Sequence, residues 1–377
     1  MVTSNLLNQK RIKPYTLYTL YLKNSRSKQA LKLVTYQKSG EQRTGILYND
    51  LIFDLQNSAR KLKIKLPSTM KEFLEGETAS MNLAKKVFNE IKKGNIKSDL
   101  KLKSVKLLSP VPNPTSMRDG YAFRQHVETA RRNRGVPMIP EFDQYPVFYF
   151  TNHNAVFGEG IIEVEDDHLQ QLDFELECAI VIGKKGKNIP AEKADNYIAG
   201  YMIMNDWSAR VLQMEEMKLN LGPAKGKDFA TSLGPWLVTV DELKPYKIST
   251  PFGNKYDLRM IARHNGKQIS DGNLKDMNWT FAELIERASY GVTLYPGDVI
   301  GSGTVGTGCY LELNGTWALK AKARGEAFTP VWLNDGDEME LEITGLGVLK
   351  NKIRKSKVSR SILARKKQIN SNTDLTD

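Results

Sequence analysis

Apolar and polar residues alternate over short runs in much of the chain, and this pattern predicts a β-rich protein. Residues 31–36 and 44–54 form such runs with polar turns between them, which predicts a small β-rich module near the N-terminus. Residues 69–74 and 79–93 carry apolar side chains at helical spacing and predict one or two helices. The prolines within residues 108–114 require an extended chain, so we place a domain boundary there.

From residue 115 onward the pattern stays strand-rich and is punctuated by glycines. Asn265-Gly266 between two apolar runs predicts a hairpin turn. Thr280 and Glu283 have the spacing of a capping box, which predicts the start of a helix. Residues 339–343 alternate strictly and predict a half-buried strand.

The formal net charge of +12 is concentrated at the two ends of the chain. Residues 1–29 hold six basic residues and no acidic one, and residues 350–377 hold nine basic residues against two acidic ones. The body between them is close to neutral, whereas nucleic-acid-binding domains gather Lys and Arg on a folded face. We therefore expect basic extensions at residues 1–29 and 351–377, and no nucleic-acid binding by the folded core. An organelle import signal is a minor alternative for the N-terminal extension.

Composition and spacing exclude several classes of protein. The longest apolar runs are far shorter than the roughly 20 residues of a membrane-spanning helix. The two cysteines, Cys178 and Cys309, do not form a disulfide framework and suit a reducing compartment, so we expect a cytoplasmic protein. The cysteines and the four histidines lack zinc-ligand spacing. Residues 301–306 fit G-x-G-x-x-G by letter, but no helical pattern follows, so we expect no dinucleotide-binding loop.

Residues 173–177, Asp-Phe-Glu-Leu-Glu, carry the most informative chemistry. In a strand alternate side chains share a face, so Glu175 and Glu177 lie on one face while Phe174 and Leu176 lie on the other. The apolar run that follows predicts a buried strand. Two carboxylates side by side on a buried strand raise each other's pKa unless a cation or a proton lies between them.

Glu-x-Glu also occurs on strands with one solvated face, and the motif alone leaves both interpretations open. A second segment favours the cation. Residues 200–204 predict another buried strand, and Asn205-Asp206 fall at its end, where a rigid scaffold presents functional side chains. Glu175, Glu177 and Asp206 are therefore candidates to converge on one hard metal ion.

At these motifs the chain resembles the fumarylacetoacetate hydrolase (FAH) superfamily, and most closely its fumarylacetoacetase branch. The likeness spans roughly residues 105–350 and rests on Asp-x-Glu-x-Glu, Asn-Asp-Trp-Ser-Ala-Arg, Lys-x-Phe-x-Thr and Ser-Gly-Thr in this order. It implies a mixed β-rich α+β fold, in which a distorted mixed β-roll over residues 109–350 carries the site and residues 30–108 form a small N-terminal β/α domain. It further implies a homodimer and a divalent metal, Mg²⁺ first and Ca²⁺ or Mn²⁺ as alternatives.

The resemblance also implies roles for individual residues. The metal ligands fall at Asp119, Glu175, Glu177 and Asp206, and such carboxylate-only sites suit Mg²⁺, Ca²⁺ or Mn²⁺. The other implied site residues are His126 as the base that activates water, Glu312 as its orienting partner, Arg210 and Lys227 as catalytic donors, and Tyr121, Gln213, Thr304 and Tyr149 as substrate contacts.

The expected function is metal-dependent hydrolysis of a carbon–carbon bond in a small diketo acid of the fumarylacetoacetate or acylpyruvate type, as in aromatic amino acid catabolism. Decarboxylation, hydration or isomerisation of a 2-oxo acid is the alternative within the superfamily. A polyanion-binding protein acting through its basic ends is the alternative from another class. Residues 130–137 depart from the fumarylacetoacetase pattern, so we expect substrate choice to depend on residues 130–149.

Overall fold

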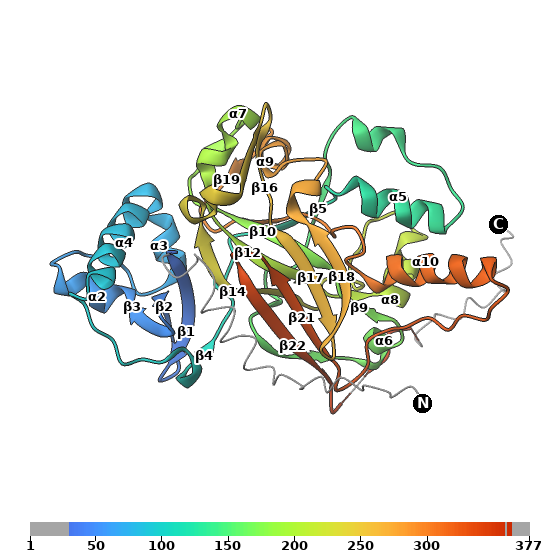
Figure 1. Cartoon of the computed structure of the whole chain (residues 1–377), viewed down its shortest axis with the longest axis horizontal. Coiled ribbons are helices and arrows are strands. Elements are labelled where there is room, and N and C mark those ends of the chain that lie inside the picture. The colour runs from blue at the N-terminus through green and yellow to red at the C-terminus, as the bar shows by residue number, and fades with distance from the viewer. Residues whose placement is uncertain (1–29, 359, 364–377) are drawn as a thin grey trace, which may run out of the picture.

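The computed structural model describes residues 30–358 and 360–363, which fold around two β-sheets (Figure 1). In this part of the chain the larger sheet has 11 strands and the smaller has 5. The larger sheet consists, in spatial order, of β3 (Leu51–Asp54), β2 (Glu41–Tyr48), β1 (Lys32–Lys38), β14 (Thr231–Thr239), β12 (Ile198–Asp206), β10 (Leu176–Ile182), β20 (Val299–Gly301), β5 (Met117–Gly120) and β6 (Phe148–Phe150), with β4 (Lys106–Leu107) beside β1 and β7 (Val156–Phe157) beside β14.

The smaller sheet packs against the larger one and closes a roll. It consists of β18 (Lys267–Asn273), β17 (Arg259–His264), β21 (Glu338–Ile343), β22 (Gly347–Lys355) and β8 (Gly160–Val164). Both sheets are mixed, because β20–β5, β14–β7 and β22–β8 pair in parallel while the other neighbours pair antiparallel. Short pairs join β9 (Leu172–Asp173) to β13 (Ser208–Ala209), β11 (Gly186–Lys187) to β19 (Thr293–Leu294), and β15 (Lys247–Thr250) to β16 (Gly253–Tyr256). The expected mixed β-rich α+β class is confirmed.

Strand β10 is buried on both faces, which explains its unbroken apolar run. Cys178, Ile180 and Ile182 pack in the core between the two sheets. Ala179 and Val181 point the other way, into a second core that is shared with the N-terminal helices. A strand covered on both faces needs no polar alternation along its length.

The N-terminal part of the described chain continues the larger sheet. Strand β1 pairs with β14, and the helices α2 (Leu55–Lys61), α3 (Met70–Glu75) and α4 (Glu77–Lys92) form the second core with these strands. The helices confirm those predicted for residues 69–93. Whether residues 30–108 and 109–350 are separate domains stays a prediction.

The predicted basic ends lie largely outside the described residues, which exclude 1–29, 359 and 364–377. The start assigned to the C-terminal tail, residue 351, falls inside β22, which runs to Lys355. In the part of the chain that the structure describes, no helix has the length and apolarity needed to cross a membrane.

Helices α5 (Arg124–Asn133) and α10 (Tyr310–Ala323) pack side by side, at the far end of the molecule from the N-terminal helices (Figure 1). The expectation that no helix follows residues 301–306 was wrong, because α10 begins at Tyr310. Asn314 and Gly315 weaken its helical signal, since both residues have low helix propensity. The remaining short helices are α6 (Asp166–Leu169), α7 (Ala191–Ala194), α8 (Arg210–Met217), α9 (Phe281–Ser289), η2 (Leu102–Ser104), η3 (Pro140–Asp143), η4 (Asp195–Tyr197), η5 (Val240–Tyr246) and η6 (Leu274–Asp276).

Two local predictions are confirmed in detail. Thr280 and Glu283 form the capping box of α9, each side chain accepting the backbone N–H of the other residue. Asn265 and Gly266 both have positive φ, as a two-residue turn between β17 and β18 requires.

Candidate active site

Three buried carboxylates meet in the larger sheet. Asp119, Glu175 and Glu177 each offer an oxygen, and these oxygens lie within 4.8 Å of one another. Glu177 is on β10, Asp119 is on β5, and β20 lies between these strands. The cluster therefore follows from strand order, although Asp119 and Glu177 are far apart in the sequence.

Gly301 on β20 makes room for the cluster. A Cβ at this position would lie 2.4 Å from Asp119 Oδ1 and 3.0 Å from Glu177 Oε2, so any larger residue would displace the carboxylates. The backbone N–H of Gly303 donates to Asp119 Oδ1 at 3.1 Å.

Glu175 is held as an anion by two buried cations. Arg210 Nη2 donates to Glu175 Oε1 at 2.8 Å, and Lys227 Nζ donates to Oε2 at 2.6 Å. Burial alone would raise the pKa of Glu175, but Lys227 and Arg210 outweigh burial and lower it to about 2. Asn205 fixes the backbone, because its Oδ1 accepts the Glu175 N–H at 2.9 Å.

Asp119 and Glu177 have the opposite electrostatics. Burial, with the charges of Asp206 and Glu175, raises the pKa of Asp119 to about 7. Burial, followed by the charge of Asp119, raises the pKa of Glu177 well above its ordinary value. Glu177 Oε2 is buried and forms no hydrogen bond with any described residue. These two carboxyl groups thus lack the cation that Glu175 has.

Asp206 completes the acidic site at the end of β12. Its Oδ2 lies 2.9 Å from Lys227 Nζ and accepts a hydrogen bond from the hydroxyl of Tyr149. Its Oδ1 is buried and unbonded within the described chain. Tyr149 reaches the site because β6 pairs with β5 and places it opposite Asp119. Asp206 is adjacent to the cluster rather than one of its three converging carboxylates.

The donor set fits a hard divalent ion. Four buried carboxylates face only Lys227 and Arg210, and Arg210 also neutralises Asp173 at 2.7 Å. Glu177 Oε2 and Asp206 Oδ1 have no hydrogen-bond partner among the described residues, and a buried polar atom without a partner is costly. All converging ligands are carboxylate oxygens, as Mg²⁺, Mn²⁺ and Ca²⁺ prefer. A divalent cation bound at this cluster would supply the missing partner.

His126 and Glu312 form a second buried unit beside the carboxylates. His126 is on α5 and Glu312 is on α10, with 2.6 Å between Nδ1 and Oε2. Glu312 Oε1 also accepts the Thr307 N–H at 2.9 Å, and Asn133 on α5 donates to the Glu312 carbonyl at 2.9 Å. Because an ionised carboxylate only accepts hydrogen bonds, Nδ1 carries the proton and Nε2 is left to accept one.

The implied substrate contacts lie around these two units. Tyr121 packs edge-on against His126, with ring centroids 6.1 Å apart, and burial raises the pKa of its hydroxyl. Thr304 Oγ1 lies 3.5 Å from Glu177 Oε1. Gln213 Oε1 accepts a hydrogen bond from Arg210 Nη1 at 2.9 Å. The structure thus brings all twelve predicted site residues to one region, while their roles stay predictions.

Sequence reasoning assigned no role to Asp173, the first carboxylate of the Asp-x-Glu-x-Glu run. Asp173 is fully buried and accepts hydrogen bonds from Arg210 and from the backbone N–H groups of Tyr310 and Leu311. The spacing contained a signal, because Asp173 shares the alternation of Glu175 and Glu177. Its partners on α10 could not be read from that spacing.

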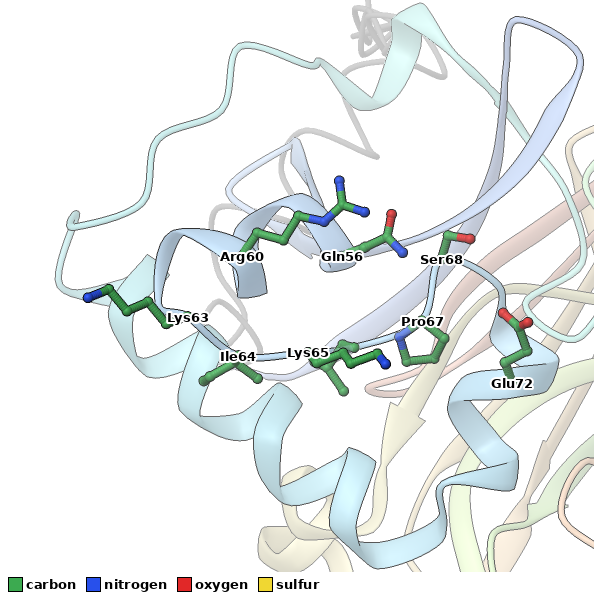
Figure 2. Close-up of a pocket in the computed structure, with 9 residues that line it drawn as sticks. Gln56, Arg60, Lys63, Ile64, Lys65, Pro67, Ser68 and Glu72 are labelled. Atoms are coloured by element: carbon green, nitrogen blue, oxygen red, sulfur yellow. The ribbon is translucent and has the colours of Figure 1, made fainter.

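A hollow of about 860 Å³ lies elsewhere, in the N-terminal part of the described chain. Gln56 and Arg60 extend from α2 at its edge, and Lys65 and Ser68 lie on the following segment (Figure 2). None of the predicted site residues lines it. Its only lining carboxylate is Glu72, so it lacks the convergent acidic groups of the sheet site.

Stabilisation by a divalent ion is expected to increase with pH. The pKa of Asp119 is about 7 in the folded protein against an ordinary value of 3.8, so the folded state holds the extra proton between these values. The contribution of the Asp119 carboxyl group to the stability of the folded state is full below about pH 4 and is lost as pH rises through about 7. A bound cation displaces this proton, so the rise in the unfolding midpoint with Mg²⁺ over EDTA should be larger at about pH 8 than at about pH 6. An equal shift at both pH values would contradict this titration.

The mixed β-roll carries buried carboxylates beside a histidine–glutamate pair, an arrangement that is typical of an enzyme active site. Residues 115–354 match the family model described as "Fumarylacetoacetate (FAA) hydrolase C-terminal". The chain therefore belongs to the fumarylacetoacetate hydrolase superfamily, as its motifs predicted.

Known relatives carry different activities in their names. The human protein "Oxaloacetate tautomerase FAHD2A, mitochondrial" is 31% identical over 290 residues, which cover 76% of this chain and 80% of the relative. Bovine fumarylacetoacetase is 36% identical over 268 residues, 59% of this chain and 63% of the relative. A solved fumarylacetoacetate hydrolase from Exiguobacterium antarcticum has the same fold, with a TM-score of 0.58 at 24% identity over 87% of this chain and 100% of that one. The compartment of this chain stays a prediction.

Proposed function

We propose that the protein is a metal-dependent hydrolase that cleaves a carbon–carbon bond in a small diketo acid of the fumarylacetoacetate or acylpyruvate type. The observation that supports this most is the buried pair of His126 and Glu312 beside the carboxylate cluster. Such a pair supplies a general base, and the cluster offers a place for the cation that this cleavage uses.

Hydrolysis requires an activated water and a stabilised leaving carbanion. His126 Nε2 takes a proton from water as the oxygen attacks a carbonyl carbon, and Glu312 stabilises the imidazolium that results. The carbon–carbon bond breaks, its electron pair passes into the leaving ketone as an enolate, and the proton returns to carbon. A divalent ion would act as a Lewis acid towards the substrate oxygens when bound at Asp119, Glu175, Glu177 and Asp206, and Mg²⁺ is the first choice that the family resemblance implies.

The second candidate is a tautomerase of a 2-oxo acid. The human relative named an oxaloacetate tautomerase favours it, since the alignment covers most of both chains. This reaction needs only a proton moved between carbon and oxygen. His126 serves it as well as it serves hydrolysis, so the static geometry of the pair is common to both candidates.

Parallel assays separate the two candidates. We expect the full chain with Mg²⁺ to consume fumarylacetoacetate or an acylpyruvate. Loss of enol absorbance measures the rate, and identification of the two cleavage products shows that the carbon–carbon bond is broken. EDTA should abolish cleavage, and Mg²⁺ or Mn²⁺ should restore it. Interconversion of oxaloacetate tautomers without cleavage of any diketo acid would favour the second candidate, and unchanged turnover in EDTA would contradict the metal.

We also propose that the protein is a homodimer, as the family resemblance implies. Sedimentation equilibrium of the full chain tests this.

The polyanion-binding alternative depends on the basic ends, most of which lie outside the described residues. It stays a prediction, and deletion of residues 1–29 and 364–377, which hold nine of the fifteen basic residues at the two ends, should weaken any salt-sensitive polyanion binding.

A further inference from the structure

Asp173 connects the two halves of the candidate site. It lies on β9, opposite Ser208 on β13, and its side chain is completely buried. A buried carboxylate without partners would be costly, but Asp173 accepts four hydrogen bonds: one from a guanidinium, two from backbone N–H groups of α10 and one from the Phe174 N–H. The guanidinium and the helix lead to two different parts of the site.

The guanidinium side leads to the metal ligands. Arg210 Nε donates to Asp173 Oδ2 at 2.9 Å, and Arg210 Nη2 lies 2.7 Å from the same oxygen. The same Nη2 donates to Glu175 Oε1 at 2.8 Å. Arg210 has little exposure, and Asp173 and Glu175 raise its pKa against the effect of burial. The orientation of Glu175 therefore depends on where Asp173 holds Arg210.

The backbone side leads to the catalytic base. Asp173 Oδ1 accepts the Tyr310 N–H at 2.7 Å, and Oδ2 accepts the Leu311 N–H at 2.9 Å. These are the first two residues of α10, whose own N-cap, Cys309, makes no side-chain capping hydrogen bond in the described chain. Asp173 thus caps α10 from a distant strand and places a negative charge at its N-terminus. The next residue, Glu312, carries the hydrogen bond to His126.

We propose that Asp173 is a positioning residue that sets the His126–Glu312 pair and the Glu175 metal ligand in register with each other. The inference rests on the proposed function for its kinetic consequences, but its structural consequences do not depend on which substrate is used. Asparagine has the same shape as aspartate, yet its amide has one accepting oxygen, and its NH₂ would face donors. Asp173→Asn should therefore loosen both halves of the site together.

The first measurement is the binding of Mn²⁺ alone to the full chain, by calorimetry well below the unfolding midpoint. Mutation of a residue that orients a metal ligand typically lowers metal affinity or activity about 10–100-fold, and we expect Asp173→Asn to lower the Mn²⁺ affinity by a factor of this size. The matched control is Asp167→Asn. Asp167 is also buried and likewise accepts two backbone N–H groups, together with one hydroxyl, but none of these hydrogen bonds comes from a predicted site residue. Equal Mn²⁺ affinity in wild type and Asp173→Asn would overturn the proposal.

The second measurement uses the wild type and needs no variant to fold. If Asp173 couples the two halves, saturation with Mn²⁺ should slow hydrogen exchange at the Tyr310 and Leu311 amides. The Ile362 and Leu363 amides, which bond to Asp167, should not respond. No change at Tyr310 and Leu311 would contradict the coupling.

The third measurement separates positioning from stability. With Mn²⁺ and substrate both saturating, Asp173→Asn should still lower kcat by about 10–100-fold, because Glu312 is displaced even when the metal is bound. A purely structural role would change the unfolding midpoint but leave kcat of the folded protein intact. If the wild type cleaves no diketo acid, the proposed function fails, while Mn²⁺ affinity and hydrogen exchange still decide the role of Asp173.

Discussion

Glu177→Gln is expected to abolish tight binding of a divalent ion and to lower the metal-dependent rate at least about 100-fold. Glu177 is fully buried, its Oε2 has no partner in the described chain, and its carboxyl group lies in the three-carboxylate cluster. An amide keeps the shape but removes the charge that a hard cation needs. Loss of several kcal/mol of electrostatic stabilisation corresponds to this change in rate.

The same variant should be more stable than the wild type when metal is removed at alkaline pH. Burial and the charge of Asp119 raise the pKa of Glu177 in the folded state, so wild-type stability falls as pH rises through that value. Glutamine does not titrate, so the difference in unfolding midpoint in EDTA should grow from neutral to alkaline pH. Glu163→Gln is the control, because the Glu163 pair with Arg354 is exposed and worth about 1 kcal/mol or less. Mn²⁺ affinity equal to that of wild type would contradict the assignment of Glu177.

The alternation at residues 174–178 predicted correctly which side chains of this segment face the carboxylate cluster and which enter the core. Glu175 and Glu177 meet Asp119, while Phe174 and Leu176 enter the core between the sheets. The prediction succeeded because the alternation of side chains is a local property of a strand. It is visible in the sequence wherever the two faces of the strand have different surroundings. The meeting with Asp119 depends on strand order, which the family resemblance supplied.

The helices that hold the base could not be predicted from pattern alone. Helix α5 is amphipathic but carries many charged and few apolar residues, and α10 contains Asn314 and Gly315 and shows no clear amphipathic stripe. Packing of the two helices against each other overrides this weak propensity. The contacts of Asp173 could not be predicted for another reason. They join Asp173 to Tyr310 and Leu311, which lie 137 and 138 positions further along the chain.

The electrostatics of the site explain why its two cations are buried. Lys227 neutralises Glu175 and Asp206 from one side, and Arg210 is shared between Asp173 and Glu175. Together they satisfy one carboxylate fully and leave Asp119 and Glu177 with raised pKa values. Glu175 is therefore ionised at all ordinary pH values, and a cation bound at this site would replace protons on Asp119 and Glu177.

His126→Gln is expected to lower the rate of carbon–carbon cleavage by about 10²–10⁴-fold without weakening Mn²⁺ binding. Glutamine can still donate to Glu312 Oε2, whereas alanine would leave this buried oxygen unpaired at a cost of about 1–3 kcal/mol. What glutamine lacks is a nitrogen that can take a proton from water near neutrality, and general-base catalysis is worth a factor of this size. Cleavage rates at saturating Mg²⁺ and Mn²⁺ calorimetry measure the two effects separately.

The controls for this variant test the pair as a unit. His168→Gln changes another buried histidine, stacked on Phe229 with ring centroids 4.1 Å apart, and should leave the rate close to wild type. Glu312→Gln should slow cleavage too, and combining it with His126→Gln should add little, since residues that act as one unit are not additive. If His126→Gln cleaves at the wild-type rate, His126 is not the base; if both single losses add in full, the two residues act independently.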